Sequence, residues 1–134
     1  MPTVLLVDDE PHLSFMVARA LRGRGIDVAS AKDGGQAFDA AVASTPDLVI
    51  TDLQMPVLDG LEFSRRLRQD PRTAHVPVIM ITGRGHRIPP QVLGETNIRA
   101  LLPKPFSLQD VLRSVDEILD LPGADARPAL GEAA

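Results

Sequence analysis

The sequence lacks cysteine, tryptophan and tyrosine among its 134 residues. The absence of cysteine excludes a disulfide framework, a thiolate metal site and a cysteine nucleophile. Aromatic residues make up 3% of the chain, and all of them are phenylalanine. Few rings are therefore present to stack against a planar cofactor such as a flavin, and this class of binding protein is disfavoured.

Positive charge is also scarce, with 14 lysines and arginines against 18 acidic residues and a net charge of -4. This balance disfavours a protein that binds nucleic acid by neutralising many phosphates, so no direct contact with DNA is expected. At the N-terminus, the apolar run at residues 4–7 is short, no basic segment precedes it, and carboxylates follow it. Neither a signal peptide nor a membrane span is predicted, no membrane partner is expected, and the expected location is cytoplasmic.

The length and composition predict one folded domain. Hydrophobic residues make up 44% of the chain and charged residues 24%, and the mean hydropathy is +0.04, which is too apolar for a disordered protein. We expect this domain to occupy residues 1–120. Residues 121–134 are rich in proline, glycine and alanine and have no amphipathic period, which predicts a flexible tail or the stub of a linker.

Short apolar runs alternate along the chain with stretches of helical periodicity. The predicted strands are residues 4–7, 27–31, 48–51, 78–81 and 100–102. The predicted helices are residues 13–21, whose apolar face includes Met16 and Val17, then 35–43, 61–69 and 107–119, and a short helix that begins near Pro89. Strict alternation of strand and helix predicts an α/β fold, a doubly wound five-stranded parallel sheet with helices on both faces.

Polar residues stand where the predicted strands end. Asp8 and Asp9 follow the first run, Asp52 follows the third, Thr82 follows the fourth, and Lys104 comes shortly after the fifth. In an open parallel sheet these positions share one edge, which is where such folds bind ligands. Carboxylates held close together repel unless a cation joins them, and Mg²⁺ prefers such oxygen ligands. With a metal on one side and Lys104 on the other, Asp52 is the candidate nucleophile towards phosphorus.

Each of these residues also has a plainer interpretation. The segment 8–11 can simply start a helix, with an acid at its cap and a proline in its first turn. Asp52 can cap nearby amides, Thr82 can serve as a turn hydroxyl, and Lys104 can be solvated at the surface. Their occurrence together, at the ends of different strands on one edge, is what favours a common site.

Four motifs resemble the receiver domain of two-component response regulators. They are Leu-Leu-Val-Asp-Asp-Glu-Pro at residues 5–11, Asp-Leu-Gln-Met-Pro-Val-Leu-Asp-Gly at 52–60, Val-Ile-Met-Ile-Thr-Gly at 78–83 and Leu-Pro-Lys-Pro-Phe at 102–106. Their order and spacing also fit that family, and the resemblance covers about residues 1–120. It implies the flavodoxin-like strand order 2-1-3-4-5.

The resemblance further implies a role in phosphorelay signal transduction. Asp52 would accept a phosphoryl group from the phosphohistidine of a histidine kinase or phosphotransfer protein. Thr82 would donate a hydrogen bond to one phosphoryl oxygen, Lys104 would pair with another, and the Lys104–Pro105 peptide bond would be cis. Phosphorylation would then switch a surface that an unknown downstream protein binds.

The resemblance also implies a Mg²⁺ cofactor. Asp9 would bind the metal directly and Asp8 through a water molecule. Asp52 and the backbone carbonyl of Gln54 would complete the ligands from the protein. The chain would thus assist only its own phosphorylation and dephosphorylation, and would not be an enzyme that acts on other substrates.

Position 101 departs from the family pattern. The family commonly has an aromatic residue three positions before the lysine, where this chain has Leu101. The aromatic part of the family's switch therefore cannot operate here. The prolines at 89 and 90 also predict a shortened fourth helix, which changes the surface that carries the output.

Three other function classes compete with a phosphorylated receiver. The first is a docking module of the same fold whose phosphorylation is incidental, and the complete acidic site argues against it. The second is a metal-dependent phosphatase that acts through Asp52, which would need a second acid two residues later, where the chain has Gln54. A flavin-binding protein of similar topology is disfavoured because acids at the site would repel the flavin phosphate.

Overall fold

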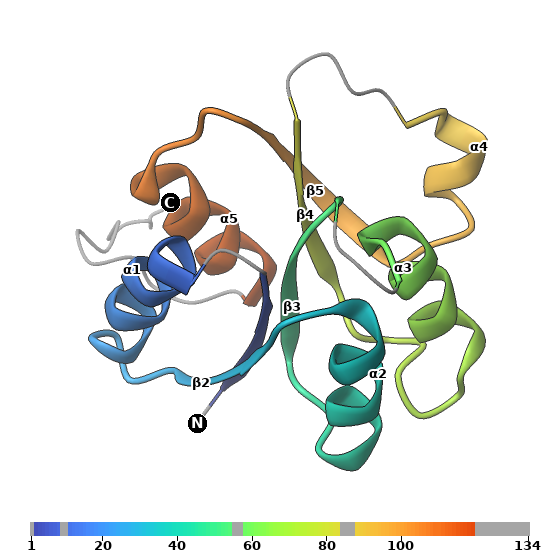
Figure 1. Ribbon diagram of the computed structural model, residues 1–134, viewed down its shortest axis with the longest axis horizontal. Coiled ribbons are helices and arrows are strands. Elements are labelled where there is room, and N and C mark those ends of the chain that lie inside the picture. Colours follow the sequence, from blue (N-terminus) through green and yellow to red (C-terminus); the bar gives the residue numbers. More distant parts are fainter. Residues whose placement is uncertain (1, 9–10, 55–57, 84–87, 120–134) are drawn as a thin grey trace, which may run out of the picture.

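The computed structural model describes residues 2–8, 11–54, 58–83 and 88–119, in which strands and helices alternate (Figure 1). The strands are β1 (Thr3–Val7), β2 (Asp27–Ala31), β3 (Leu48–Asp52), β4 (Val78–Thr82) and β5 (Ile98–Pro103). The helices are α1 (Pro11–Arg22), α2 (Gly34–Ala43), α3 (Gly60–Gln69), α4 (Pro90–Leu93) and α5 (Leu108–Leu119). Every predicted strand and helix is present. The predicted tail at residues 121–134 lies outside the described residues.

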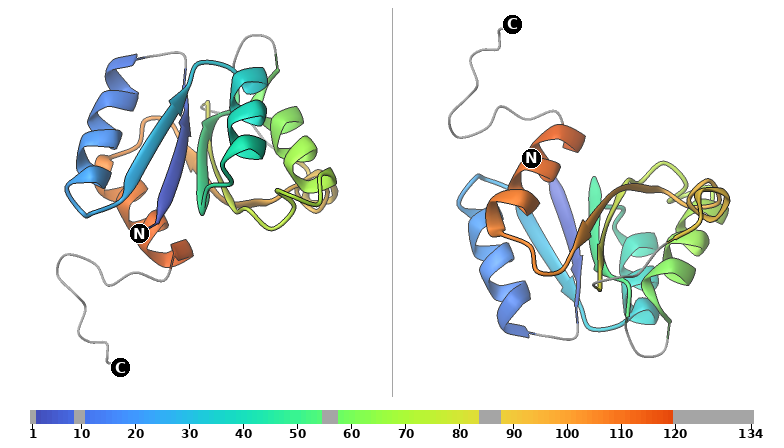
Figure 2. Two further views of the ribbon diagram at one scale, coloured as in Figure 1. Left: turned by 90° about the horizontal axis from the view of Figure 1, so that it is seen from below. Right: turned by 90° about the horizontal axis from the view of Figure 1, so that it is seen from above.

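The five strands form one parallel sheet in the order β2-β1-β3-β4-β5, which confirms the predicted topology. Helices α1 and α5 cover one face of the sheet, and α2, α3 and α4 lie on the other (Figure 2). This arrangement follows from right-handed crossovers between parallel strands. The predicted doubly wound α/β fold is therefore confirmed.

Side chains alternate between two apolar cores on opposite faces of the sheet. In β1, Val4 and Leu6 pack in the core formed with α1 and α5, whereas Leu5 and Val7 pack in the core formed with α2 and α3. β3 and β4 alternate in the same way, and all their residues are buried. Strands buried on both faces explain the continuous apolar runs in the sequence.

The expected apolar face of the first helix needs one correction. Val17 is buried in the core as predicted, but the neighbouring Met16 is 54% exposed. At about 100° per residue, positions 17, 18 and 21 share one side of α1, and Met16 points towards the opposite side. Ala18 instead joins Val17 and Leu21 in the buried stripe of α1.

The outer strand β2 pairs with β1 alone and carries small or polar exposed side chains. One carbonyl of β2, that of Val28, accepts a hydrogen bond from the Arg22 guanidinium at 3.1 Å. Within the described ranges, no helix is long and apolar enough to cross a lipid bilayer.

Candidate functional site

The carboxyl ends of four strands bring the predicted site residues to one edge of the sheet. Val7 pairs in register with Thr51, so the residues that follow them, Asp8 and Asp52, lie at the same level on adjacent strands. Thr82 ends β4 and pairs with Pro103. The backbone N–H of Lys104 then donates to the Thr82 carbonyl at 2.8 Å, which extends the pairing one residue past β5.

The Asp52 side chain is 8% exposed and both its oxygens have hydrogen-bond donors. Lys104 Nζ lies 3.1 Å from Oδ2 and donates a hydrogen bond to it. The backbone N–H of Gln54 donates to Oδ1 at 3.4 Å. Because the Lys104 side chain remains 37% exposed, it places a positive charge between the buried carboxylate and solvent.

The loop after β3 is held by two glycines that the sequence reasoning did not identify as part of the site. A Cβ atom on Gly60 would lie 2.2 Å from the Asp52 carbonyl oxygen, and one on Gly34 would lie 2.3 Å from the Leu58 carbonyl oxygen. Both distances are far below van der Waals contact, so only glycine allows this approach. One signal in the sequence is a glycine at the start of each helix, where other residues form helices better.

Three further contacts fix the backbone on either side of Asp52. The buried Thr51 hydroxyl donates to the Asp52 carbonyl at 3.0 Å. After the loop, the Asp59 carboxylate caps α3 by accepting from the Glu62 N–H at 2.8 Å, and the Gly60 N–H donates to the Leu53 carbonyl at 2.8 Å. The strand end that carries Asp52 and the start of α3 are thus joined directly.

The described residues supply only part of the predicted metal site. Asp8 and Asp52 stand on adjacent strand ends, while Asp9 lies outside the residues that the structure describes. Within the described part of the chain, no three histidine, cysteine, aspartate or glutamate side chains form a group that could hold a metal ion. The donors present are carboxylate and carbonyl oxygens, the ligand type that suits Mg²⁺, so the donor chemistry fits this ion.

The peptide bond between Lys104 and Pro105 is cis, as expected from the resemblance. Position 101, where the family commonly has an aromatic residue, carries a leucine that is 39% exposed on β5. Helix α4 is a single turn with no buried residue, which confirms the prediction of a short fourth helix.

Comparison with known proteins agrees with the fold. The chain is 38% identical over 120 residues to the DNA-binding dual master transcriptional regulator RpaA from Synechocystis, an alignment that covers 89% of this chain and 49% of that protein. The chain thus spans about half the length of the curated relatives it matches.

Solved structures match over nearly their full length. A response regulator from Chloroflexus aurantiacus described as putative is 33% identical, with a TM-score of 0.80 over 89% of this chain and 98% of that one. The receiver domain of a sensor histidine kinase from Pseudomonas aeruginosa is 27% identical, with a TM-score of 0.78 over 89% of this chain and 98% of that one. The latter structure contains a magnesium ion coordinated in its active site cleft.

The family model for the response regulator receiver domain matches residues 4–116, which include most of the helices and all of the sheet except Thr3. A match over this much of the chain establishes the family. The chain is therefore a member of the receiver domain family of two-component response regulators.

Proposed function

We propose that this receiver takes a phosphoryl group onto Asp52 from the phosphohistidine of a histidine kinase or phosphotransfer protein. The observation that carries the proposal is the buried Asp52 carboxylate at the end of β3, paired with Lys104 at 3.1 Å. An Asp52 carboxylate oxygen forms the new bond to phosphorus while the bond between phosphorus and the histidine nitrogen breaks. The electron pair of the broken bond returns to the imidazole, so atoms and charge balance.

The residues that would hold Mg²⁺ in this proposal are Asp8, Asp9, Asp52 and the Gln54 backbone carbonyl. When bound, the ion neutralises negative charge that the carboxylates and the incoming phosphoryl group bring together. The oxygen-rich donors at the ends of β1 and β3 support this assignment, as does the magnesium ion in the related receiver from Pseudomonas aeruginosa.

Lys104 and Thr82 act on the phosphoryl group itself. Lys104 already contacts the carboxylate, and its partly exposed side chain can transfer that contact to a phosphoryl oxygen as the group arrives. The Thr82 hydroxyl, at the end of the neighbouring strand, donates to another phosphoryl oxygen. The new interactions draw Thr82 and the chain after β4 towards the site, which is how phosphorylation changes the outer surface.

The chain acts as a phosphoacceptor and not as an enzyme on other molecules, because Gln54 stands where a phosphatase of this kind would need a second acid. Residues 1–120 form the receiver, and residues 121–134 form a tail or a linker. The partners are the phosphoryl donor and a downstream protein. Nucleic acid is not a direct partner of this acidic chain.

The test is intact mass spectrometry after incubation with acetyl phosphate and Mg²⁺. Wild type and a control variant, Asp39→Asn, which removes an exposed acid of α2, should each gain one phosphate. Asp52→Asn should gain none. Mg²⁺ with beryllofluoride, which mimics the phosphoryl group, should raise the Tm of wild type and not that of Asp9→Ala. A labile phosphate on Asp52→Asn at full stoichiometry would show that the acceptor is a different residue.

A further inference from the structure

The two ends of α4 are held very differently. At its start, the capping residue is Pro89, which has no polar side-chain atom to cap the first turn, and among the described residues none of the helix is buried. At its end, the Thr96 N–H and hydroxyl both donate to the Leu93 carbonyl, at 3.1 and 2.9 Å. The Thr96 hydroxyl also accepts from the Ile98 N–H at 3.2 Å, which ties the end of α4 to the start of β5.

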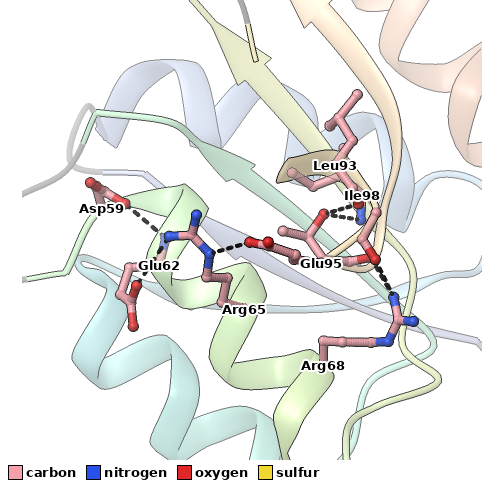
Figure 3. Close-up of polar contacts among 9 residues, drawn as sticks. Asp59, Glu62, Arg65, Arg68, Leu93, Glu95 and Ile98 are labelled. Atoms are coloured by element: carbon pink, nitrogen blue, oxygen red, sulfur yellow. Dashed lines mark hydrogen bonds and ion pairs between the residues drawn. The ribbon is translucent and has the colours of Figure 1, made fainter. Parts of the chain in front are cut away.

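Two arginines of α3 reach across to this same end of α4 (Figure 3). Arg68 Nη1 donates to the carbonyls of Thr96 at 2.9 Å and of Gly94 at 3.4 Å. Arg65 Nε lies 3.3 Å from a carboxylate oxygen of Glu95. We call these two arginines and the turn that they hold, residues 94–96, the α3 clamp.

Carbonyls past the last turn of a helix lack partners within the helix, and a guanidinium is well suited to satisfy them. Arg68 fills this role from a neighbouring element, so its hydrogen bonds fix the position of α4 as well as its end. Because no side chain of α4 is buried, the clamp and the Thr96 hydrogen bonds replace the core packing that positions an ordinary helix.

The opposite end of α3 is fixed to the strand that carries Asp52. The Gly60 N–H donates to the Leu53 carbonyl at 2.8 Å, and its Cα packs against the Asp52 carbonyl too closely for any Cβ. Phe63 and Leu67 anchor the helix in the core with no exposed surface. Helix α3 therefore connects the end of β3 rigidly to the end of α4.

We propose that the α3 clamp holds the C-terminal end of α4 stationary when Asp52 is phosphorylated, so that α4 pivots about residues 94–96. The displacement is then largest at the start of the helix, in residues 88–92, which the chain joins to Thr82. This inference rests on the proposed phosphorylation of Asp52. It supplies a route from the site to the outer surface that needs no aromatic residue at position 101.

The pivot is tested by NMR on the uniformly labelled protein with and without Mg²⁺ and beryllofluoride. In wild type, amide shifts should change for residues 88–92 and stay nearly constant for residues 94–97. In Arg68→Gln, the changes should spread through residues 94–97, because the turn is no longer held. The double variant Arg65→Gln with Arg68→Gln should show still larger shift changes in residues 94–97.

Arg66→Gln is the matched control. Arg66 lies on the same helix and loses the same charge, but it contacts Glu62 at 3.7 Å, within α3. Glutamine and arginine have similar helix propensities, so the two substitutions change the intrinsic helix preference of α3 equally. Arg66→Gln should keep the wild-type pattern of shifts.

Hydrogen exchange without beryllofluoride tests the clamp separately from the response. The Thr96 amide should exchange several-fold faster in Arg68→Gln than in Arg66→Gln. Equal exchange in these two variants would overturn the clamp, and equal shift patterns would overturn the pivot.

If wild type takes no phosphate from acetyl phosphate, the proposed function fails and the pivot with it. A phosphate adduct together with shifts at residues 94–97 in wild type as large as those at 88–92 overturns the pivot alone.

Discussion

The geometry around Asp52 depends directly on Gly60, which lies against the Asp52 backbone. A Cβ atom added at this position would lie 2.2 Å from the Asp52 carbonyl oxygen and 3.0 Å from Met80 Sδ. The first of these neighbours is backbone and cannot rotate away, so a larger residue must move either α3 or the end of β3. The position of the Asp52 carboxylate is thus set in part by the absence of a side chain at residue 60.

We expect Gly60→Ala to lower the free energy of unfolding by about 1 to 3 kcal/mol, the usual cost of overpacking. Chemical denaturation measures this loss. Gly94→Ala is the control, because a Cβ there meets nothing closer than the Gln91 carbonyl oxygen at 3.5 Å and the backbone is already helical, with φ at -66°. Equal stability of the two variants would show that the end of β3 yields easily.

Asp70, which follows α3, gives a pH dependence at the scale of one residue. The Arg72 side chain and backbone N–H donate to its carboxylate and lower its pKa from 3.8 to about 2. A carboxyl group whose pKa is lower in the folded protein stabilises the fold above its unfolded pKa, and that contribution disappears as the pH falls towards the folded pKa.

The stability advantage of wild type over Asp70→Asn should therefore be complete above pH 3.8 and decline as the pH approaches 2. Urea unfolding at a series of pH values measures it. Arg72→Gln should bring the pKa of Asp70 back towards 3.8 in a carboxyl NMR titration. A difference between wild type and Asp70→Asn that does not vary with pH would contradict this origin.

At the scale of elements, α1 and α5 are joined by more than their shared core. Arg24, in the turn after α1, places Nη1 2.5 and 2.6 Å from the two carboxylate oxygens of Asp116 on α5. The Asp116 side chain is 9% exposed and that of Arg24 25% exposed. A carboxylate this well buried depends on its partner, because solvent compensates little for its loss.

Arg24→Ala should cost about 1.5 to 3 kcal/mol of unfolding free energy, the range for hydrogen bonds to charged groups. Glu117→Ala, at an exposed position next to Asp116, should change stability by less than about 0.5 kcal/mol. A double-mutant cycle with Asp116→Ala isolates the pair. Additive effects of the two substitutions would mean that the contact contributes nothing in solution.

The sequence predicts the elements well and their side-chain contacts poorly. Strands buried on both faces leave continuous apolar runs, and parallel strands share one edge, so the meeting of Asp52, Thr82 and Lys104 follows from order alone. Contacts such as Arg68 with the Thr96 carbonyl depend on the rotation of each helix and on its packing distance. No local sequence pattern encodes the rotation of a helix or its packing distance. The wrong prediction that Met16 lies on the buried face of α1 has the same origin.

At the scale of the whole molecule, the described residues enclose two complete cores on the two faces of the sheet. Both are built from residues between Val4 and Leu119. Helix α5 contributes Val111 and Val115, which are fully buried. The fold therefore needs the chain as far as the end of α5.

A protein ending at residue 120 should keep the Tm of the 134-residue chain and the same phosphate adduct. Differential scanning calorimetry and intact mass measure the two properties. A protein ending at residue 110 should lose cooperative unfolding, because it lacks the buried valines of α5. A lower Tm for the 120-residue protein would show that residues 121–134 contribute to the core.

The Arg22 guanidinium on the Val28 carbonyl bears on the solubility of the protein. An outer strand with free backbone groups is a template for strands of other molecules, and edge-to-edge pairing of this kind begins many aggregates. Arg22 occupies one of the acceptors that an incoming strand would need and brings a charge to that edge, where Asp27 is exposed. Arg22→Ala should leave the monomer folded but shorten the time to visible aggregation at high protein concentration. The Val28 carbonyl would lose its hydrogen bond from Arg22 and could then accept one from a strand of another molecule.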